Sequence, residues 1–113
     1  MGMDYSRAKD WIVAERGFEP EHLGKCESIM CQGNGYLCLR NATDEFNPRE
    51  QRDLFVAGTF NKFDDNEVTE LPNAADVSRL EIKLDGQRFS LLTGTAEDYD
   101  RTLDLKTGET VRK

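Results

Sequence analysis

The three cysteines and the single histidine are the side chains in this sequence best suited to bind a metal. They are Cys26, Cys31, Cys38 and His22. Structural zinc sites usually contain a closely spaced Cys-x-x-Cys pair, and no such pair occurs here. An odd number of cysteines without a secretory signal also argues against a disulfide framework. We therefore interpret the cysteines as reduced, partly buried thiols and predict no metal and no cofactor.

Other patterns that could support chemistry are incomplete. Gly33-Asn34-Gly35 begins a Gly-x-Gly-x-x-Gly motif, but Cys38 stands at the third glycine position and no helix pattern follows, which argues against a dinucleotide site. The carboxylates in residues 61–67 lack the ligand spacing and central glycine of a calcium loop. A small hydrolase would need two carboxylates held in one cleft, and a solvated acidic surface explains the acidic residues more simply. We assign no catalytic residue.

Composition limits the partners. The chain has 113 residues, enough for one domain, with a formal charge of −7 and only 37% hydrophobic residues. Nucleic acid and anionic membranes bind clustered Lys and Arg, so neither is expected as a partner. No apolar run is long enough to span a bilayer, and the N-terminus has no signal-peptide core. We expect a cytoplasmic protein.

The elements that must position these side chains are mostly strands. Residues 18–24 allow one turn of helix, with Pro20 at its start and Gly24 at its end. Residues 36–40 and 54–60 are apolar at successive positions, which is typical of strands covered on both faces, and Asn34-Gly35 indicates a turn before the first of them. The polar residues 41–53 between these runs are predicted to form a surface loop.

A hairpin is the most distinct local prediction. Residues 80–84 alternate apolar and charged, Asp85-Gly86 provides a two-residue turn, and residues 87–91 return. This register places Ile82 opposite Phe89 and Leu80 opposite Leu91 on one face, which we expect to face the core, with Lys83 opposite Arg88 on the other. Tyr99, Leu103 and Leu105 share one face of a later strand. A turn at 106–109 then leads into a return strand at 110–113.

These patterns predict an all-β fold. Short strands separated by regular turns, with at most a short N-terminal helical turn, indicate an antiparallel β-sandwich forming a single domain over residues 1–113. Because the sequence stops within a return strand, we expect it to be part of a longer protein. Bare sheet edges and apolar faces would then favour a homo-oligomer, with residues 99–105 meeting a partner strand.

Several phrases together resemble the N-terminal domain of glycoside hydrolase family 65, the maltose, trehalose and kojibiose phosphorylases. Their order and spacing make the resemblance specific, and it covers nearly the whole chain. The phrases are residues 11–13, 18–23, 26–37, 56–61, 70–73, 84–86 and 101–105. Two positions depart from the family pattern: Cys38 stands where glycine is usual, and Asn41 stands near a usual small residue.

The resemblance implies a larger, galactose mutarotase-like super-sandwich followed by an (α/α)₆ barrel that carries the general-acid glutamate and the phosphate pocket. None of those positions occurs here, so the resemblance assigns no catalytic, cofactor or metal residue to this chain. It implies a parent enzyme that uses a disaccharide and phosphate, or hydrolyses α-glucosides. For this segment it implies structural and oligomerisation roles.

Two other functions stay open. A stand-alone carbohydrate-binding module would present exposed aromatic rings, but Phe55, Phe60 and Phe89 fall at positions typical of a core, which leaves Trp11 as the main candidate. A small complete hydrolase is disfavoured for the reason given above. We therefore expect a chain that is inactive alone.

Overall fold

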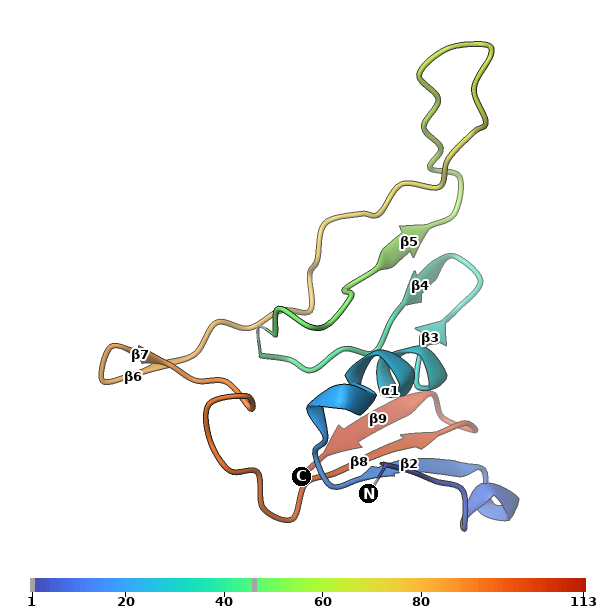
Figure 1. Ribbon diagram of the computed structural model, residues 1–113. Coiled ribbons are helices and arrows are strands. Elements are labelled where there is room, and N and C mark those ends of the chain that lie inside the picture. Colours follow the sequence, from blue (N-terminus) through green and yellow to red (C-terminus); the bar gives the residue numbers. More distant parts are fainter. Residues whose placement is uncertain (1, 46) are drawn as a thin grey trace.

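The computed structural model describes residues 2–45 and 47–113. Two antiparallel sheets lie on either side of one short helix (Figure 1). The first sheet has the strand order β1-β2-β8-β9 and the second the order β3-β4-β5. The strands of the first sheet are β1 (Gly2–Asp4), β2 (Ile12–Arg16), β8 (Asp100–Asp104) and β9 (Glu109–Arg112). Those of the second sheet are β3 (Gln32–Gly33), β4 (Leu37–Leu39) and β5 (Leu54–Val56). The predicted antiparallel, mostly β fold is confirmed.

The first sheet joins the two ends of the sequence. β2 pairs with β8 in the register Glu15 opposite Arg101, and β8 pairs with β9 through the turn at residues 105–108. The return strand predicted at 110–113 is therefore confirmed. β8 is an interior strand, hydrogen-bonded on both sides, so the prediction that residues 99–105 offer a bare edge to a partner is wrong. The sequence pattern could not reveal that β2 already occupies that edge.

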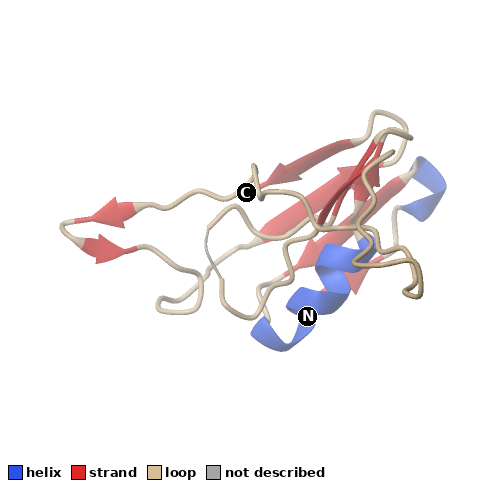
Figure 2. Ribbon diagram, turned by 90° about the horizontal axis from the view of Figure 1, so that it is seen from above, coloured by secondary structure: helices blue, strands red, loops and turns tan. Residues whose placement is uncertain are grey.

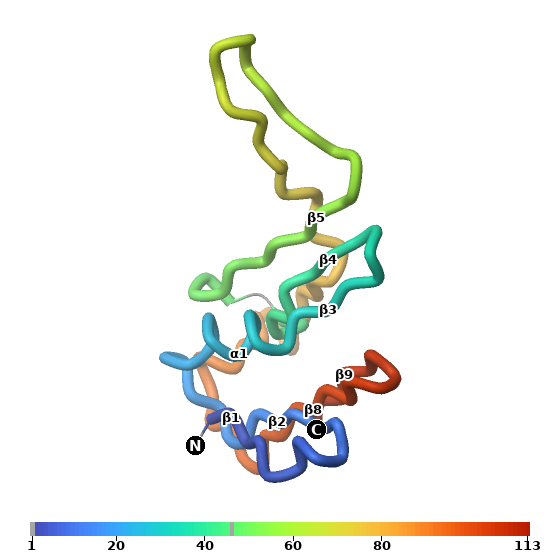
Figure 3. Tube along the Cα trace, turned by 90° about the vertical axis from the view of Figure 1, so that its right-hand side faces the viewer, coloured from blue at the N-terminus to red at the C-terminus, as the bar shows by residue number. Residues whose placement is uncertain are grey.

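The helix is longer than the single turn predicted. Short 3₁₀ helices cover Ala8–Asp10 (η1) and Pro20–His22 (η2), and the α-helix α1 covers Leu23–Ile29. Gly24 lies inside α1 instead of ending it, and the helix closes where the Met30 N–H donates to the Cys26 carbonyl. α1 lies between the two sheets, as Figure 3 also shows, and it buries Leu23 and Cys26. With Ala14, Met30, Leu54, Tyr99 and Leu103 these residues form the small core.

The two apolar runs are less covered than predicted. The run at 54–60 pairs only as far as Val56, because Gly58 adopts a left-handed φ of 80° in a turn and Phe60 points into solvent. In β4, Leu37 and Cys38 are exposed, so a strand covered on both faces was the wrong expectation. The Asn34-Gly35 turn is confirmed: the Asn34 side chain accepts the backbone N–H groups of Tyr36 and Leu37.

The predicted hairpin forms, but it faces solvent. β6 (Lys83–Leu84) and β7 (Gln87–Arg88) pair in the predicted register, and the Phe89 N–H donates to the Ile82 carbonyl. Leu80, however, bridges to Glu45 instead of Leu91. The hairpin stands clear of both sheets (Figure 2), and its apolar side chains are exposed. The expectation that this face is part of the core of this chain is therefore wrong.

Candidate functional site

A buried network of arginines and carboxylates is the most elaborate polar structure in the chain. It is organised by the segment between β4 and β5, residues 40–53, of which 41–53 were predicted to be a surface loop. The described residues of 41–53 belong to no helix or named strand, and Asp44, Pro48, Arg49 and Gln51 are exposed, but Thr43, Glu45 and Asn47 are at most 4% exposed, so the expectation that the whole loop lies on the surface is wrong. The segment is polar because its partners are buried ionic side chains distant in sequence. Sequence spacing alone does not reveal such pairings.

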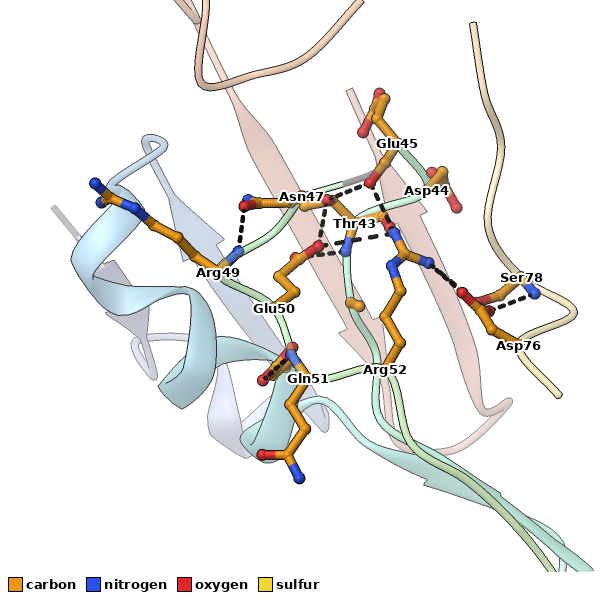
Figure 4. Close-up of polar contacts among 12 residues, drawn as sticks. Thr43, Asp44, Glu45, Asn47, Arg49, Glu50, Gln51, Arg52, Asp76 and Ser78 are labelled. Carbon is orange, nitrogen blue, oxygen red and sulfur yellow. Dashed lines mark hydrogen bonds and ion pairs between the residues drawn. The ribbon is translucent and has the colours of Figure 1, made fainter. Parts of the chain in front are cut away.

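Arg52 ties the segment together (Figure 4). Its Nη2 donates to the carbonyl oxygens of Thr43 and Glu45, the latter at 2.7 Å, and its Nη1 lies 3.3 Å from Asp76 Oδ2. Glu50 accepts both the backbone N–H and the hydroxyl of Thr43, at 2.7 and 2.8 Å. Burial raises the pKa of Glu50, against the opposing effect of the Thr43 hydrogen bonds. These bonds replace the backbone ladder that the segment lacks.

Two further arginines reach the segment from the first sheet. Arg112 on β9 makes a two-point contact with Glu45, with Nη1 to Oε2 at 2.7 Å and Nη2 to Oε1 at 2.5 Å. Burial favours a higher pKa for Glu45, but the hydrogen bonds and charge of Arg112 outweigh it and hold this pKa below its ordinary value. On β8, Arg101 Nη1 donates to the Asn41 carbonyl at 2.7 Å.

Arg101 also makes the most deeply buried ion pair. Its Nε and Nη2 each lie 2.9 Å from Oε2 of Glu15, directly opposite on β2, and the two side chains are 3% and 1% exposed. A fourth pair joins Arg40 Nη2 to Glu27 Oε1 of α1 at 2.8 Å. The network thus links β2, α1, β8 and β9 through residues 40–53.

The arginines of this network are paired with carboxylates. Each of the four arginines faces a glutamate: Glu15, Glu27, Glu45 or Glu50. A polar hollow of about 230 Å³ lies beside the network, but Arg40, Arg101 and Arg112, which line it, are held by carboxylates.

The residues considered for a zinc site are not brought together. Cys26 is buried in α1, whereas Cys31 and Cys38 are exposed, and all three are free thiols. His22 Nδ1 lies 3.2 Å from Oε2 of Glu19, three residues earlier in the chain. Within the described residues, no three His, Cys, Asp or Glu side chains are grouped to hold a metal ion. No helix there is long and apolar enough to cross a membrane.

Burial governs the chemistry of Cys26. Its thiol is fully buried beside Glu15, and burial, followed by the charge of that carboxylate, raises its pKa to about 12. The thiolate is the reactive form, so this cysteine is inert near neutral pH.

The fold and the network define a β-rich module whose ionic side chains are committed to holding its own segments together. The sequence matches the glycosyl hydrolase family 65 N-terminal domain over residues 13–113, and the chain belongs to that family. The resemblance noted from its sequence phrases is thereby confirmed.

Named relatives agree with this assignment. The chain is 48% identical to a kojibiose phosphorylase of Halothermothrix orenii over 105 residues and 38% identical to one of Escherichia coli over 97 residues. It is 27% identical to an alpha,alpha-trehalose phosphorylase of Thermoanaerobacter brockii over 119 residues. These regions cover 86–93% of this chain but only 12–15% of the relatives.

The fold is also found in a solved structure described as a kojibiose phosphorylase from the human microbiome. The TM-score is 0.84 at 21% identity, covering 97% of this chain and 16% of that one. At this identity the likeness establishes the fold alone.

Proposed function

We propose that this chain is a non-catalytic N-terminal segment of a disaccharide phosphorylase, and that it supports a catalytic domain and takes part in self-association. The observation that carries the proposal is the family match over residues 13–113. The ion pairs of the buried carboxylates Glu15 and Glu27 with arginines of this chain support it. Kojibiose is the favoured substrate of the whole enzyme, because the relatives at 48% and 38% identity carry that name.

The chemistry of such an enzyme follows from the resemblance. A carboxylic acid protonates the glycosidic oxygen while phosphate attacks the opposite face of the sugar, replacing the water of an inverting hydrolase. That reaction requires no metal or organic cofactor. The segment described here would contribute packing surface, and the solvent-facing apolar side chains of its hairpin, Leu80, Ile82, Leu84 and Phe89, suit that role. The same proposal places this chain within a larger super-sandwich of the whole enzyme and places that enzyme in the cytoplasm.

Grafting provides the test. The Halothermothrix orenii enzyme is re-made with its matching 105 residues replaced by this chain, and a second graft carries Arg101→Met to disrupt the network. The first graft should phosphorolyse kojibiose at a rate within about tenfold of the parent, while the second should lose folded protein. This chain alone should release neither glucose nor glucose 1-phosphate from kojibiose, trehalose or maltose. Turnover by the chain alone, or a folded but inactive first graft, would refute the proposal.

A carbohydrate-binding module is the second candidate, and one observation favours it. Trp11, Tyr36 and Phe60 are exposed, so the expectation that Phe60 lies in the core is wrong. These rings lie on separate parts of the chain, directly after η1, in the β3–β4 turn and in the segment after β5, which does not suit a single stacking platform. Saturable calorimetric binding of kojibiose that Trp11→Ala abolishes would make this candidate the first.

A further inference from the structure

The turn between β3 and β4 contains the only Asn-Gly pair in the sequence, Asn34-Gly35. Gly35 adopts a left-handed φ of 83°, and a Cβ built on it would meet no atom within 4 Å. Asn34, Gly35 and Tyr36 are all exposed, at one end of the second sheet (Figure 1). Water therefore reaches the Asn34 side chain and the backbone that follows it.

The side-chain oxygen of Asn34 is held by two backbone donors. Oδ1 accepts the Tyr36 N–H at 3.0 Å and the Leu37 N–H at 2.8 Å. Because both partners are donors, the atom that faces them is the amide oxygen and not the amide nitrogen. The Gly35 nitrogen belongs to the ring that the first of these hydrogen bonds closes, so it stays close to the amide carbon of Asn34.

This geometry suits an intramolecular reaction of the amide. When the Gly35 nitrogen attacks Cγ of Asn34, a C–N bond forms and negative charge develops on Oδ1, where the two N–H donors stabilise it as an oxyanion hole does. The attacking nitrogen loses its proton, and the side-chain amine takes up a proton and leaves as ammonia, which closes a five-membered succinimide ring. Water then opens either carbonyl of this ring and leaves aspartate or isoaspartate.

The backbone nitrogen that must attack is unobstructed only after Asn34. Gly35 has no side chain, whereas the other five asparagines precede residues that have one, and the residue after Asn47 is a proline without an N–H. Among the residues that the structure describes, the Gly35 N–H donates to no acceptor. Its proton is therefore open to removal by hydroxide.

We propose that Asn34 is a site of spontaneous deamidation, at which the turn converts its own side-chain amide into a carboxylate with water as the co-reactant. Aspartate keeps the main chain, and its carboxylate accepts the same two N–H groups with added charge. Isoaspartate carries the main chain through the side-chain carbon, and the added methylene disturbs the pairing of Gly33 with Cys38. Either product adds a negative charge to an apolar groove that Asn34 lines and whose other lining residues are uncharged.

Peptide mass spectrometry of the whole chain, incubated at pH 8, tests the proposal. Trypsin cleaves after Lys25 and Arg40, so residues 26–40 form a fragment in which Asn34 is the only asparagine. This fragment should gain the mass of an amide-to-acid conversion at residue 34, as two products that chromatography separates, while fragments with the other asparagines stay unchanged. Conversion should be slower at pH 5, because the attacking nitrogen must lose its proton. A synthetic peptide of residues 26–40 is the reference, and it should convert no faster than the folded chain.

Two glycine substitutions separate the chemistry from backbone strain. Gly35→Ala adds a Cβ beside the attacking nitrogen and should slow conversion at least about tenfold. Gly58→Ala is the matched control, because Gly58 is also exposed, has a φ of 80° and has no atom within 4 Å of an added Cβ, but it follows no asparagine. The control should leave conversion at Asn34 unchanged, and circular dichroism verifies that both variants fold.

Three results would overturn the inference. An unchanged 26–40 fragment would show that Asn34 is stable. A folded chain that converts at least about tenfold more slowly than the free peptide would show that the turn holds the amide away from Gly35. Aspartate without isoaspartate would indicate direct hydrolysis and no succinimide ring.

Discussion

Arg101→Met should be among the most damaging single substitutions in this chain. The substitution leaves the carboxylate of Glu15, a residue that is only 1% exposed, without its cation. It also removes the hydrogen bond to the Asn41 carbonyl that links residues 40–53 to β8. Removing one partner of a buried pair costs about 3–5 kcal/mol, a large part of the roughly 5–15 kcal/mol that stabilises a typical domain. At a slope of about 2 kcal/mol per molar urea, the unfolding midpoint should fall by about 2 M.

The companion variant is Glu15→Leu combined with Arg101→Met. Replacing both partners by apolar side chains leaves no buried charge, so the double variant should be more stable than Arg101→Met alone. Arg101→Lys keeps the charge but loses the planar guanidinium, so its stability should lie between those of the wild type and Arg101→Met. Urea unfolding at pH 7, followed by the fluorescence of Trp11, measures all of them. A single variant within about 1 kcal/mol of the wild type, or a double variant less stable than the single, would show that the network does not hold the fold together.

Two further predictions concern titration and thiols. The folded state lowers the pKa of Glu45, so the ionised carboxylate stabilises the protein at pH values above its ordinary pKa of 4.5, and this stabilisation is lost as pH falls through the folded-state pKa. Arg112→Met should therefore flatten the dependence of the urea midpoint on pH between pH 7 and 3. An unchanged profile would contradict the assignment. In the native protein, Cys31 and Cys38 should react rapidly with a disulfide reagent at pH 8, while Cys26 should react only after unfolding, because it is buried and its pKa is about 12. Rapid reaction of all three thiols would contradict the buried position of Cys26.

Local pairing was predictable from the sequence because it depends on neighbouring residues. The turns at Asn34-Gly35 and Asp85-Gly86, and the facing of Lys83 and Arg88, follow from residue types that tolerate positive φ and from the two-residue period of strands. The turn between β8 and β9 was predictable for the same reason.

Burial was not predictable in the same way. The apolar pattern placed Phe60 and Ile82 in the core, but both are exposed, and the polar pattern placed residues 41–53 on the surface, but Thr43, Glu45 and Asn47 within them are buried. Thr43 and Glu45 can be buried because Arg52, Arg101 and Arg112 donate hydrogen bonds to the polar groups of this segment. Two of these arginines lie about 60 residues further along the chain. The candidate site is made of such distant pairs, so its residues gave no local signal.

The pairing of β2 with β8 also constrains how the domain can be made. Glu15 and Arg101 are 86 residues apart, so at about 5–20 residues per second a ribosome needs roughly 4–17 s after releasing the first strand to supply the second. During that interval β2 has only β1 beside it, and the sheet next to α1 lacks β8 and β9. Long-range pairing of this kind slows folding, because a large loop must close before any contact stabilises it. A nascent chain halted before residue 100 would therefore lack both β8 and β9, two of the four strands of its main sheet.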